Sequence, residues 1–173
     1  VAGTNGKTTT VKMIETILTH TGCSVRHNAS GANLDNGLVS AFLTDARWNG
    51  RLTSDYFIFE VDEATLPNIL KELTPTIIVL TNLFRDQLDR YGEVDVIAEK
   101  WQQAFSRLDT GNQHIKKDQL TIIANADDPH LVLVGSNLTA TVKYFGLEDS
   151  SLFLPKMQHA TDTIYCPRCG SRL

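Results

Sequence analysis

The sequence predicts an α/β fold built on a mainly parallel, doubly wound sheet, and three observations lead to that prediction. Short apolar runs alternate with segments of helical periodicity along most of the 173 residues. A glycine-containing loop, residues 1–9, leads directly into the first helical segment. Clusters of polar residues follow the apolar runs, and the carboxyl ends of parallel strands are where such sheets bind ligands.

The opening segment Val1–Thr9 has the composition of a phosphate-binding loop that runs into a helix. Its glycines allow the turn and a close backbone approach, Lys7 supplies a cation for the outer phosphates, and Thr8 supplies a hydroxyl for Mg²⁺. Val1 stands where the common pattern has a glycine, so the loop is a variant; a glycine-containing turn before a surface helix is the alternative. We predict a nucleoside triphosphate site formed by Gly3, Thr4, Asn5, Gly6, Lys7, Thr8 and Thr9.

The elements that follow the loop are predicted from local patterns. A helix is expected up to Gly22, because apolar residues recur at helical spacing at Val11, Ile14, Ile17 and Leu18. A short strand is expected at 24–27, and a polar loop at 29–34 separates it from a helix at 36–47. That second helix is predicted to bury Leu38, Ala41 and Phe42.

The remaining elements continue the alternation of strand and helix. The apolar run 56–61 predicts a strand covered on both faces, and Pro67 favours the start of a helix that runs through Leu73. Strands are expected at 76–81, 120–124 and 139–145, and a helix at 94–108. Polar clusters fall where strands end, at residues 4–9, 60–63, 82–89 and 125–128, so we expect them to form one site.

Acidic and amide side chains in these clusters have candidate roles. Glu60 is the best protein ligand for Mg²⁺, because a carboxylate at the end of an apolar strand is costly unless it is paired or metal-bound; a solvated strand-end acid is the alternative. Asp62 and Glu63 are weaker candidates, since Glu63 also suits a helix N-terminus. Asn125 has an amide suited to an adenine edge, and the segment 127–129 equally suits a helix cap.

The Cys-Pro-Arg-Cys-Gly segment at residues 166–170 is half of a zinc knuckle, in which Cys166 and Cys169 supply two thiolates from one tight turn. A structural site needs four ligands, and we expect the second pair beyond residue 173. A redox-active cysteine pair is the rival interpretation, although its position in the chain does not suit it. His159 is an unconvincing substitute ligand, and Cys23 is expected to be a small buried hydrophobe.

Charge and hydropathy exclude some classes of protein. A net charge of −4 and a pI near 5.7 argue against a nucleic-acid-binding surface. We expect no transmembrane segment, because no apolar run is long enough to span a bilayer. A phosphate loop normally follows a buried strand, so we expect the chain to be a fragment cut at both ends.

Several of these motifs occur together, in the same order, in the Mur ligase family, which this chain resembles. They are Gly3–Thr9, Ser30–Leu34, Phe59–Ala64, Thr81–Glu93, Asn125–Pro129 and Tyr165–Gly170. The loop and the segment 125–129 are general to the family. The segment ending at Glu93 and the cysteine pair resemble one branch, the MurT synthetase subunits of lipid II isoglutaminyl synthases.

The resemblance implies a fold and a division into domains. Residues 1–160 would form the family's central ATP-binding domain, with its N-terminal strand largely missing. Residues 161–173 would form the first half of a zinc-ribbon insertion, and the C-terminal ligase domain would be absent. We expect such a piece to bind nucleotide but to be inactive by itself.

The resemblance also implies an activity, partners and residue roles. ATP would phosphorylate the D-glutamate carboxylate of lipid II, and ammonia from a GatD-type glutamine amidotransferase would then convert it to D-isoglutamine, in peptidoglycan biosynthesis. Lys7 would act in catalysis with Glu60, Thr8 and Glu60 would hold Mg²⁺, Asn33 would lie near the nucleotide, and Asn125 would contact adenine. The enzyme would be cytoplasmic and act at the inner face of the membrane.

Two departures from the family pattern concern a second metal site. Amino-acid-adding members have a metal-binding histidine where this chain has Gln87, whose amide oxygen suits Mg²⁺ better than softer metals. Lys100 stands either at the place of the family's carbamylated lysine or simply on a helix surface. Two other functions stay open: an amino-acid-adding ligase of the Mur or folylpolyglutamate synthase type, and a nucleotide-binding module without catalysis.

Overall fold

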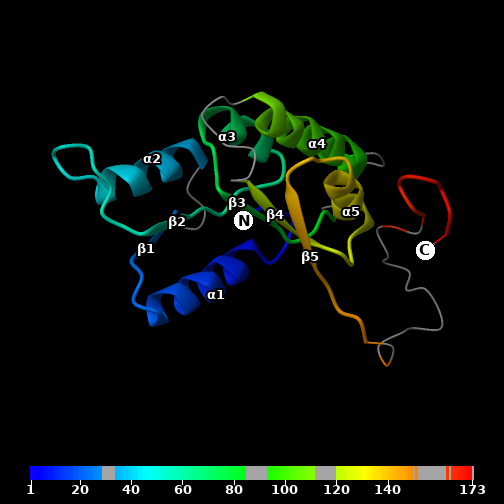
Figure 1. Cartoon of the computed structure of the whole chain (residues 1–173), viewed down its shortest axis with the longest axis horizontal. Coiled ribbons are helices and arrows are strands. Elements are labelled where there is room, and N and C mark those ends of the chain that lie inside the picture. The colour runs from blue at the N-terminus through cyan, green and yellow to red at the C-terminus, as the bar shows by residue number, and fades with distance from the viewer. Residues whose placement is uncertain are drawn as a thin grey trace.

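The chain folds as a parallel α/β domain. The structure is a computed structural model, and it describes residues 1–28, 34–84, 93–111, 120–149, 151, 163 and 165–172. Helices and strands alternate as the sequence predicts (Figure 1), with one further helix, α5, for which the sequence suggested only a cap at 127–129. The elements are α1 (Lys7–His20), β1 (Val25–His27), α2 (Leu34–Asp45), β2 (Tyr56–Ile58), α3 (Leu66–Glu72), β3 (Ile77–Leu80), α4 (Glu93–Gly111), β4 (Thr121–Asn125), α5 (Pro129–Ser136) and β5 (Thr141–Phe145).

All the strand pairs are parallel. β1 pairs with β2, and β4 lies between β3 and β5. Ala2 joins the two groups, because it forms parallel bridges to both Val61 and Leu80. Its N–H donates to the Val79 carbonyl at 2.8 Å, and its own carbonyl accepts from the Thr81 N–H at 2.9 Å. The start of the phosphate loop therefore lies between the two groups of strands, as a topological switch point requires.

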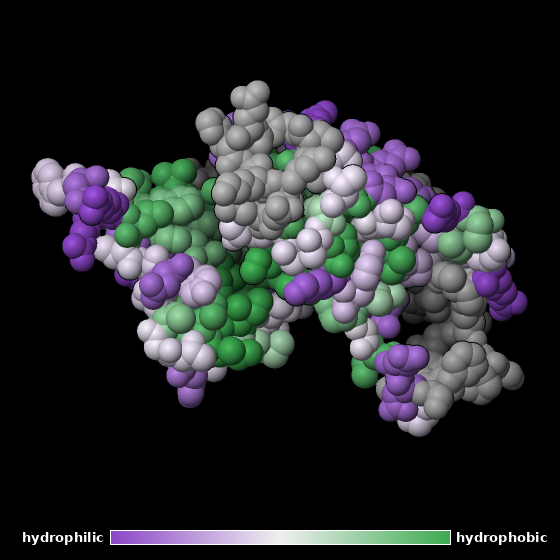
Figure 2. Space-filling model, viewed as in Figure 1, coloured by the Kyte–Doolittle hydropathy of each residue, from purple (hydrophilic) through white to green (hydrophobic). Residues whose placement is uncertain are grey.

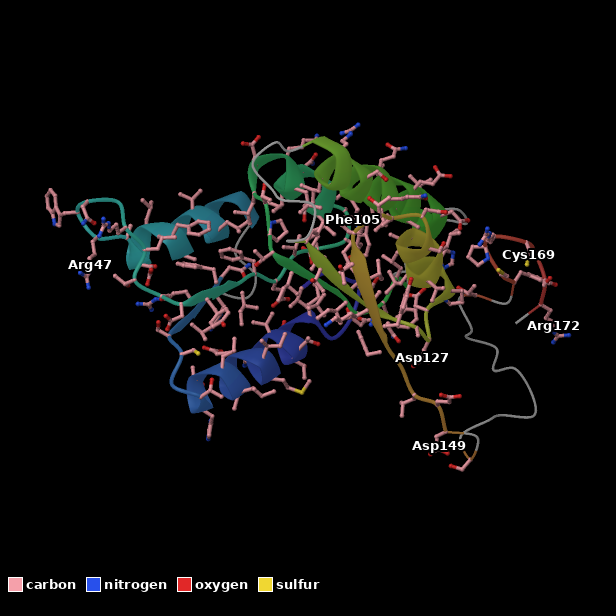
Figure 3. The ribbon with its side chains drawn as sticks, viewed as in Figure 1. Arg47, Phe105, Asp127, Asp149, Cys169 and Arg172 are labelled. Atoms are coloured by element: carbon pink, nitrogen blue, oxygen red, sulfur yellow. The ribbon has the colours of Figure 1, made fainter. Side chains whose placement is uncertain are left out.

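The main core lies between the β3–β4–β5 strands and the helices α3, α4 and α5. Figure 1 shows α1 on one side of the strands and α3 and α4 on the other, which confirms the doubly wound arrangement. Figure 3 places Phe105 between α4 and the strands. The largest fully buried side chains are Trp101, Phe105, Leu80, Leu83, Ile122, Leu131 and Val134.

Two helix starts follow from capping chemistry. The Asp128 carboxylate accepts from the backbone N–H groups of His130 at 3.0 Å and Leu131 at 3.4 Å, so the segment 127–129 does cap a helix, α5. Pro129 and Pro67 each lie in the first turn of their helix, where the missing N–H is no loss. Among the described helices, none is long and apolar enough to cross a bilayer.

The prediction that the strand at 56–61 is covered on both faces is wrong. Regular pairing ends at Ile58, and Tyr56 is 47% exposed. An apolar hollow of about 630 Å³ lies between β2 and β3, next to the point where Ala2 bridges Val61 and Leu80. Its lining includes Ile14, Leu18, Phe57, Phe59, Leu70 and Ile77. Figure 2 shows apolar residues gathered at the surface over α1 and α2.

Smaller corrections concern element ends and exposure. The second helix ends at Asp45 rather than residue 47, because the Asp45 side chain turns back to bind Thr53 and Ser54. Cys23 is half-buried rather than buried, since it lies in the turn after α1. Of the apolar residues at helical spacing in α1, Val11 is buried and Ile17 is 64% exposed.

Candidate functional site

The loop before α1 has the backbone that its glycines were predicted to allow. Gly3 and Gly6 both have positive φ, +144° and +79°. Gly6 is also the N-cap of α1, so no side chain caps the first turn of this helix. Among the described residues, the backbone N–H groups of Gly6, Lys7, Thr8 and Thr9 have no hydrogen-bond partner. Four free donors at a helix N-terminus form a site that favours an anion.

The loop is held against the segment that follows β3. The Asn82 side chain forms a two-way amide pair with the Asn5 backbone, accepting from its N–H at 2.8 Å and donating to its carbonyl at 3.1 Å. The Thr4 hydroxyl donates to the Phe84 carbonyl at 3.2 Å and accepts from the Phe84 N–H at 3.0 Å. Thr81 donates to the Asn5 carbonyl at 2.9 Å. These bonds fix the loop's shape before any ligand binds.

Thr8 and Glu60, the two predicted Mg²⁺ ligands, lie side by side. The Thr8 hydroxyl is 2.8 Å from each carboxylate oxygen of Glu60. These residues lie 52 positions apart in the sequence, so only the fold brings them together. Mg²⁺ prefers oxygen ligands, and this hydroxyl and this carboxylate can supply two of them. The free N–H groups beside them face the place where the phosphates of a nucleotide would bind. The residues therefore fit the ion.

Lys7 is folded over the loop. Its Nζ donates to the carbonyls of Gly3 at 2.8 Å and Thr4 at 3.0 Å, and it lies 3.2 Å from an Asp62 carboxylate oxygen. The Lys7 side chain is only 12% exposed, whereas that of Asp62 is 62% exposed. Asp62 thus belongs to the site as a partner of the lysine. The Glu63 carbonyl accepts from the Trp101 indole N–H at 2.8 Å, so the backbone after Glu60 is tied to α4.

Asn28 is a residue of this site that was not predicted. Its buried side chain donates to the Glu60 carbonyl at 3.0 Å and accepts from the Glu60 N–H at 2.8 Å. The regular pairing of β1 with β2 ends at Ile58, and these two hydrogen bonds take its place at Glu60 and hold the Glu60 backbone in position. Asn28 directly follows β1, so a polar residue at a strand end was the available signal.

The fourth polar cluster also reaches the loop. Asn125 donates to the Thr81 carbonyl at 3.0 Å, and its amide oxygen accepts from the Asp127 N–H at 2.9 Å. Asp128 accepts from the Leu83 N–H at 2.6 Å, which joins the start of α5 to the segment after β3. The described residues of all four predicted clusters thus meet at one edge of the sheet. The adenine contact of Asn125 stays a prediction.

Other predicted residues lie away from the phosphate loop or outside the residues that the structure describes. Asn33, Gln87 and His159 lie outside the described residues, as do 85–92 of the polar segment 82–93. Lys100 is exposed on α4, beside the buried Trp101. Its carbamylation stays a prediction.

Cys166 and Cys169 flank one tight turn, and Figure 3 shows Cys169 at the far side of the molecule from α1. The Gly170 N–H donates to the Cys166 carbonyl at 2.9 Å, and Gly170 has a φ of +70°. Hydrogen bonding with the Ser171 side chain and backbone, with smaller effects of Cys166 and Arg168, lowers the pKa of the Cys169 thiol, which lies 3.3 Å from the Ser171 hydroxyl oxygen. The described residues contain no group of three or more possible metal ligands, and the turn fits half of a zinc site.

The sequence is similar to known proteins along nearly its whole length. A family profile described as the Mur ligase middle domain matches residues 1–167. The MurT subunit of lipid II isoglutaminyl synthase (glutamine-hydrolyzing) from Staphylococcus aureus (strain COL) is 34% identical over 100% of this chain and 36% of its own length. The MurT subunit from Streptococcus pneumoniae (strain ATCC BAA-255 / R6) is 31% identical over 98% of this chain and 35% of its own length.

A solved structure has the same fold. The MurF ligase from Thermotoga maritima in complex with ADP matches 86% of this chain and 32% of its own, with a TM-score of 0.65 and 23% identity. The chain spans about a third of the length of each of these relatives. The profile match and the two full-length alignments show that the chain belongs to the Mur ligase family, whose middle domain it contains.

Proposed function

We propose that the protein containing this chain is the synthetase subunit of a lipid II isoglutaminyl synthase, using ATP to amidate the D-glutamate of lipid II. The observation that carries the proposal is the pairing of Thr8 with Glu60 beside Lys7 and four free N–H groups. That arrangement suits a Mg²⁺–nucleotide. The MurT relatives, 34% and 31% identical, supply the substrate and the reaction.

The proposed reaction has two steps. A carboxylate oxygen of D-glutamate attacks the γ-phosphorus of ATP, and ADP leaves, which gives an acyl phosphate. Ammonia then attacks the acyl carbon, phosphate leaves with the C–O electron pair, and the nitrogen loses a proton to give the carboxamide of D-isoglutamine. A GatD-type amidotransferase would release the ammonia from glutamine.

The residues of this chain position and neutralise the phosphates. The N–H groups of residues 6–9 point to where phosphate oxygens would bind, and no rearrangement of the loop is needed to present them. Mg²⁺, held by Thr8 and Glu60, would neutralise oxygen charge during phosphoryl transfer. Lys7 would exchange its two carbonyl partners for phosphate oxygens. Asn28 would keep Glu60 in place throughout.

The rest of the protein is part of the proposal. The relatives are about three times as long as this chain, so further domains would supply the lipid II and partner contacts. Cys166 and Cys169 would bind a structural Zn²⁺ together with a second pair of ligands. Because the substrate is lipid-linked, the enzyme would work at the cytoplasmic face of the membrane.

The test uses the full-length protein with lipid II, ATP, Mg²⁺ and glutamine, with and without a GatD-type glutaminase. Mass spectrometry of the stem peptide is expected to show glutamate converted to its carboxamide only with the glutaminase present. Lys7→Ala is expected to abolish the conversion, whereas a variant with Lys12→Ala, at an exposed lysine five residues later in α1, is expected to retain it.

A ligase that adds an amino acid is the second candidate. UDP-N-acetylmuramate–L-alanine ligase from Thermobifida fusca is 30% identical over 75% of this chain, which favours that candidate. ATP hydrolysis stimulated by a free amino acid, with an unmodified lipid II stem peptide, would select it instead. Absence of any turnover in the full-length protein, with intact nucleotide binding, would point to a non-catalytic module.

A further inference from the structure

The loop between α2 and β2, residues 46–52, projects from the molecule and exposes a tryptophan. Figure 1 shows α2 and this loop extending away from α1 and from the other helices. Trp48 has a relative exposure of 109%, so none of the described residues covers its indole ring. The other tryptophan of the chain, Trp101, is 0% exposed. A fully exposed tryptophan on a projecting loop has a large apolar surface available for a partner.

The loop is rigidly built at its base. The Asp45 carboxylate, whose side chain is 0% exposed, accepts from the hydroxyls of Thr53 at 2.9 Å and Ser54 at 2.6 Å, and from both of their N–H groups. Arg26 lies 3.3 Å from the same carboxylate. The conformation that exposes Trp48 is therefore fixed by contacts to which Trp48 itself does not contribute.

Two arginines flank the tryptophan. The Arg47 N–H donates to the Arg51 carbonyl at 2.9 Å, which brings these residues opposite each other across the turn, and Figure 3 places Arg47 at the projecting end. Within the described residues, neither arginine has an acidic side chain at ion-pair distance. The formal charge of the whole chain is −4, so this positive tip stands out from an acidic protein. Such a tip is complementary to an anionic surface.

The exposed face of α2 carries further apolar residues. Val39 is 55% exposed and Leu43 is 70% exposed, and these residues are one helical turn apart. Ala46, also exposed, follows at the next turn and leads into the loop. Leu52, at the other end of the loop, is 45% exposed. An apolar helix face that ends in tryptophan and arginine is typical of elements that lie in the interface of a bilayer.

We infer that this α2 tip, composed of Val39, Leu43, Trp48, Leu52, Arg47 and Arg51, docks on an anionic phospholipid membrane. Trp48 would enter the headgroup region, and the two arginines would contact lipid phosphates. A protein partner fits less well, because a convex loop tip offers little of the roughly 800 Å² that a stable interface takes from each side. A bilayer accepts a convex projection without a matching groove.

Docking by this tip leaves the nucleotide site open. The loop leads into the amino end of β2, whereas the phosphate loop, Glu60 and Asn82 lie at the carboxyl ends of parallel strands. The two sites are therefore on opposite edges of the sheet. The inference does not depend on the reaction proposed above, since it uses only the exposure and charge of the tip.

The experiment uses the full-length protein with vesicles of phosphatidylglycerol mixed with phosphatidylcholine, and with vesicles of phosphatidylcholine alone. We expect binding to the anionic vesicles. Each arginine at such a surface contributes about fivefold to partitioning, so Arg47→Gln with Arg51→Gln is expected to weaken binding about 30-fold. The matched control, Lys12→Gln with Arg107→Gln, removes the same charge from exposed positions on α1 and α4 and is expected to bind like the wild type.

Fluorescence locates the contact. The difference between the emission spectra of the wild type and Trp48→Phe isolates Trp48, whatever further tryptophans the full-length protein contains. Anionic vesicles are expected to shift this difference spectrum to the blue. An unshifted difference spectrum, absence of vesicle binding, or equal weakening by the control pair would overturn the inference. ADP affinity, expected to be equal in all variants, shows that each one is folded.

Discussion

Gly3→Ala is the substitution that most directly tests how the phosphate loop is packed. An added Cβ would clash with the Thr81 hydroxyl oxygen and would lie 2.7 Å from the Asn82 carbonyl oxygen and 3.0 Å from the Asn82 nitrogen. The Thr81 side chain can rotate away only by losing its bond to the Asn5 carbonyl, and the Asn82 backbone is held because the Thr4 N–H donates to its carbonyl at 3.0 Å. Alanine at this position therefore pushes the loop away from the segment after β3.

Gly6→Ala is the matched control for the magnitude. Gly6 also has a positive φ, +79°, but an added Cβ would meet nothing within 4 Å. Its cost is backbone strain alone, about 1–2 kcal/mol. Gly3→Ala adds overpacking of about 1–3 kcal/mol to a strain of about 1–3 kcal/mol, which gives about 2–6 kcal/mol in total. The difference between the two variants measures the contact with Asn82.

Urea denaturation without nucleotide gives the free energy of unfolding of each variant. The two values can be compared if the dependence of this free energy on urea concentration, the m-value, is the same in both variants. Calorimetric titration with Mg²⁺ and ADP is expected to show weaker binding by Gly3→Ala, since the loop is displaced. The packing argument is refuted if Gly3→Ala destabilises the chain no more than Gly6→Ala does.

Three further predictions concern other contacts. Asn28→Ala leaves the Glu60 backbone without its amide partner, so we expect a loss of about 1–3 kcal/mol in urea denaturation, and ADP binding weakened more with Mg²⁺ than without it. The Ser54 hydroxyl, acting against burial, holds the pKa of Asp45 below its ordinary value of 3.8, so this carboxylate stabilises the fold fully above pH 3.8 and less as the pH falls below it. Thermal unfolding of Asp45→Asn should thus depend less on pH in that acidic range than that of the wild type. Trp101→Phe loses the 2.8 Å bond to the Glu63 carbonyl and is expected to cost about 1–3 kcal/mol, and a urea midpoint equal to that of the wild type would contradict this.

Much of the fold follows from local patterns in the sequence. The alternation of apolar runs and helical periodicity predicted the parallel sheet and the order of its elements, although ends shifted by a few residues. The glycines and Lys7–Thr8 identified the phosphate loop, and the acidic pair before Pro129 suited the cap of α5. These features depend on bonds within a few residues of one another, so they can be recognised without knowing which strands become neighbours.

The tertiary structure alone decided which distant residues meet. Asn28 pairs with Glu60 across 32 positions, and Asn82 pairs with Asn5 across 77, because β1, β2 and β3 end at the same edge of the sheet. The apolar composition of residues 56–61 did not reveal that β2 borders an open hollow. Nor did the sequence distinguish exposed Trp48 from buried Trp101. Burial and long-range pairing depend on how elements pack together, and the free energy of that packing is not contained in any local pattern.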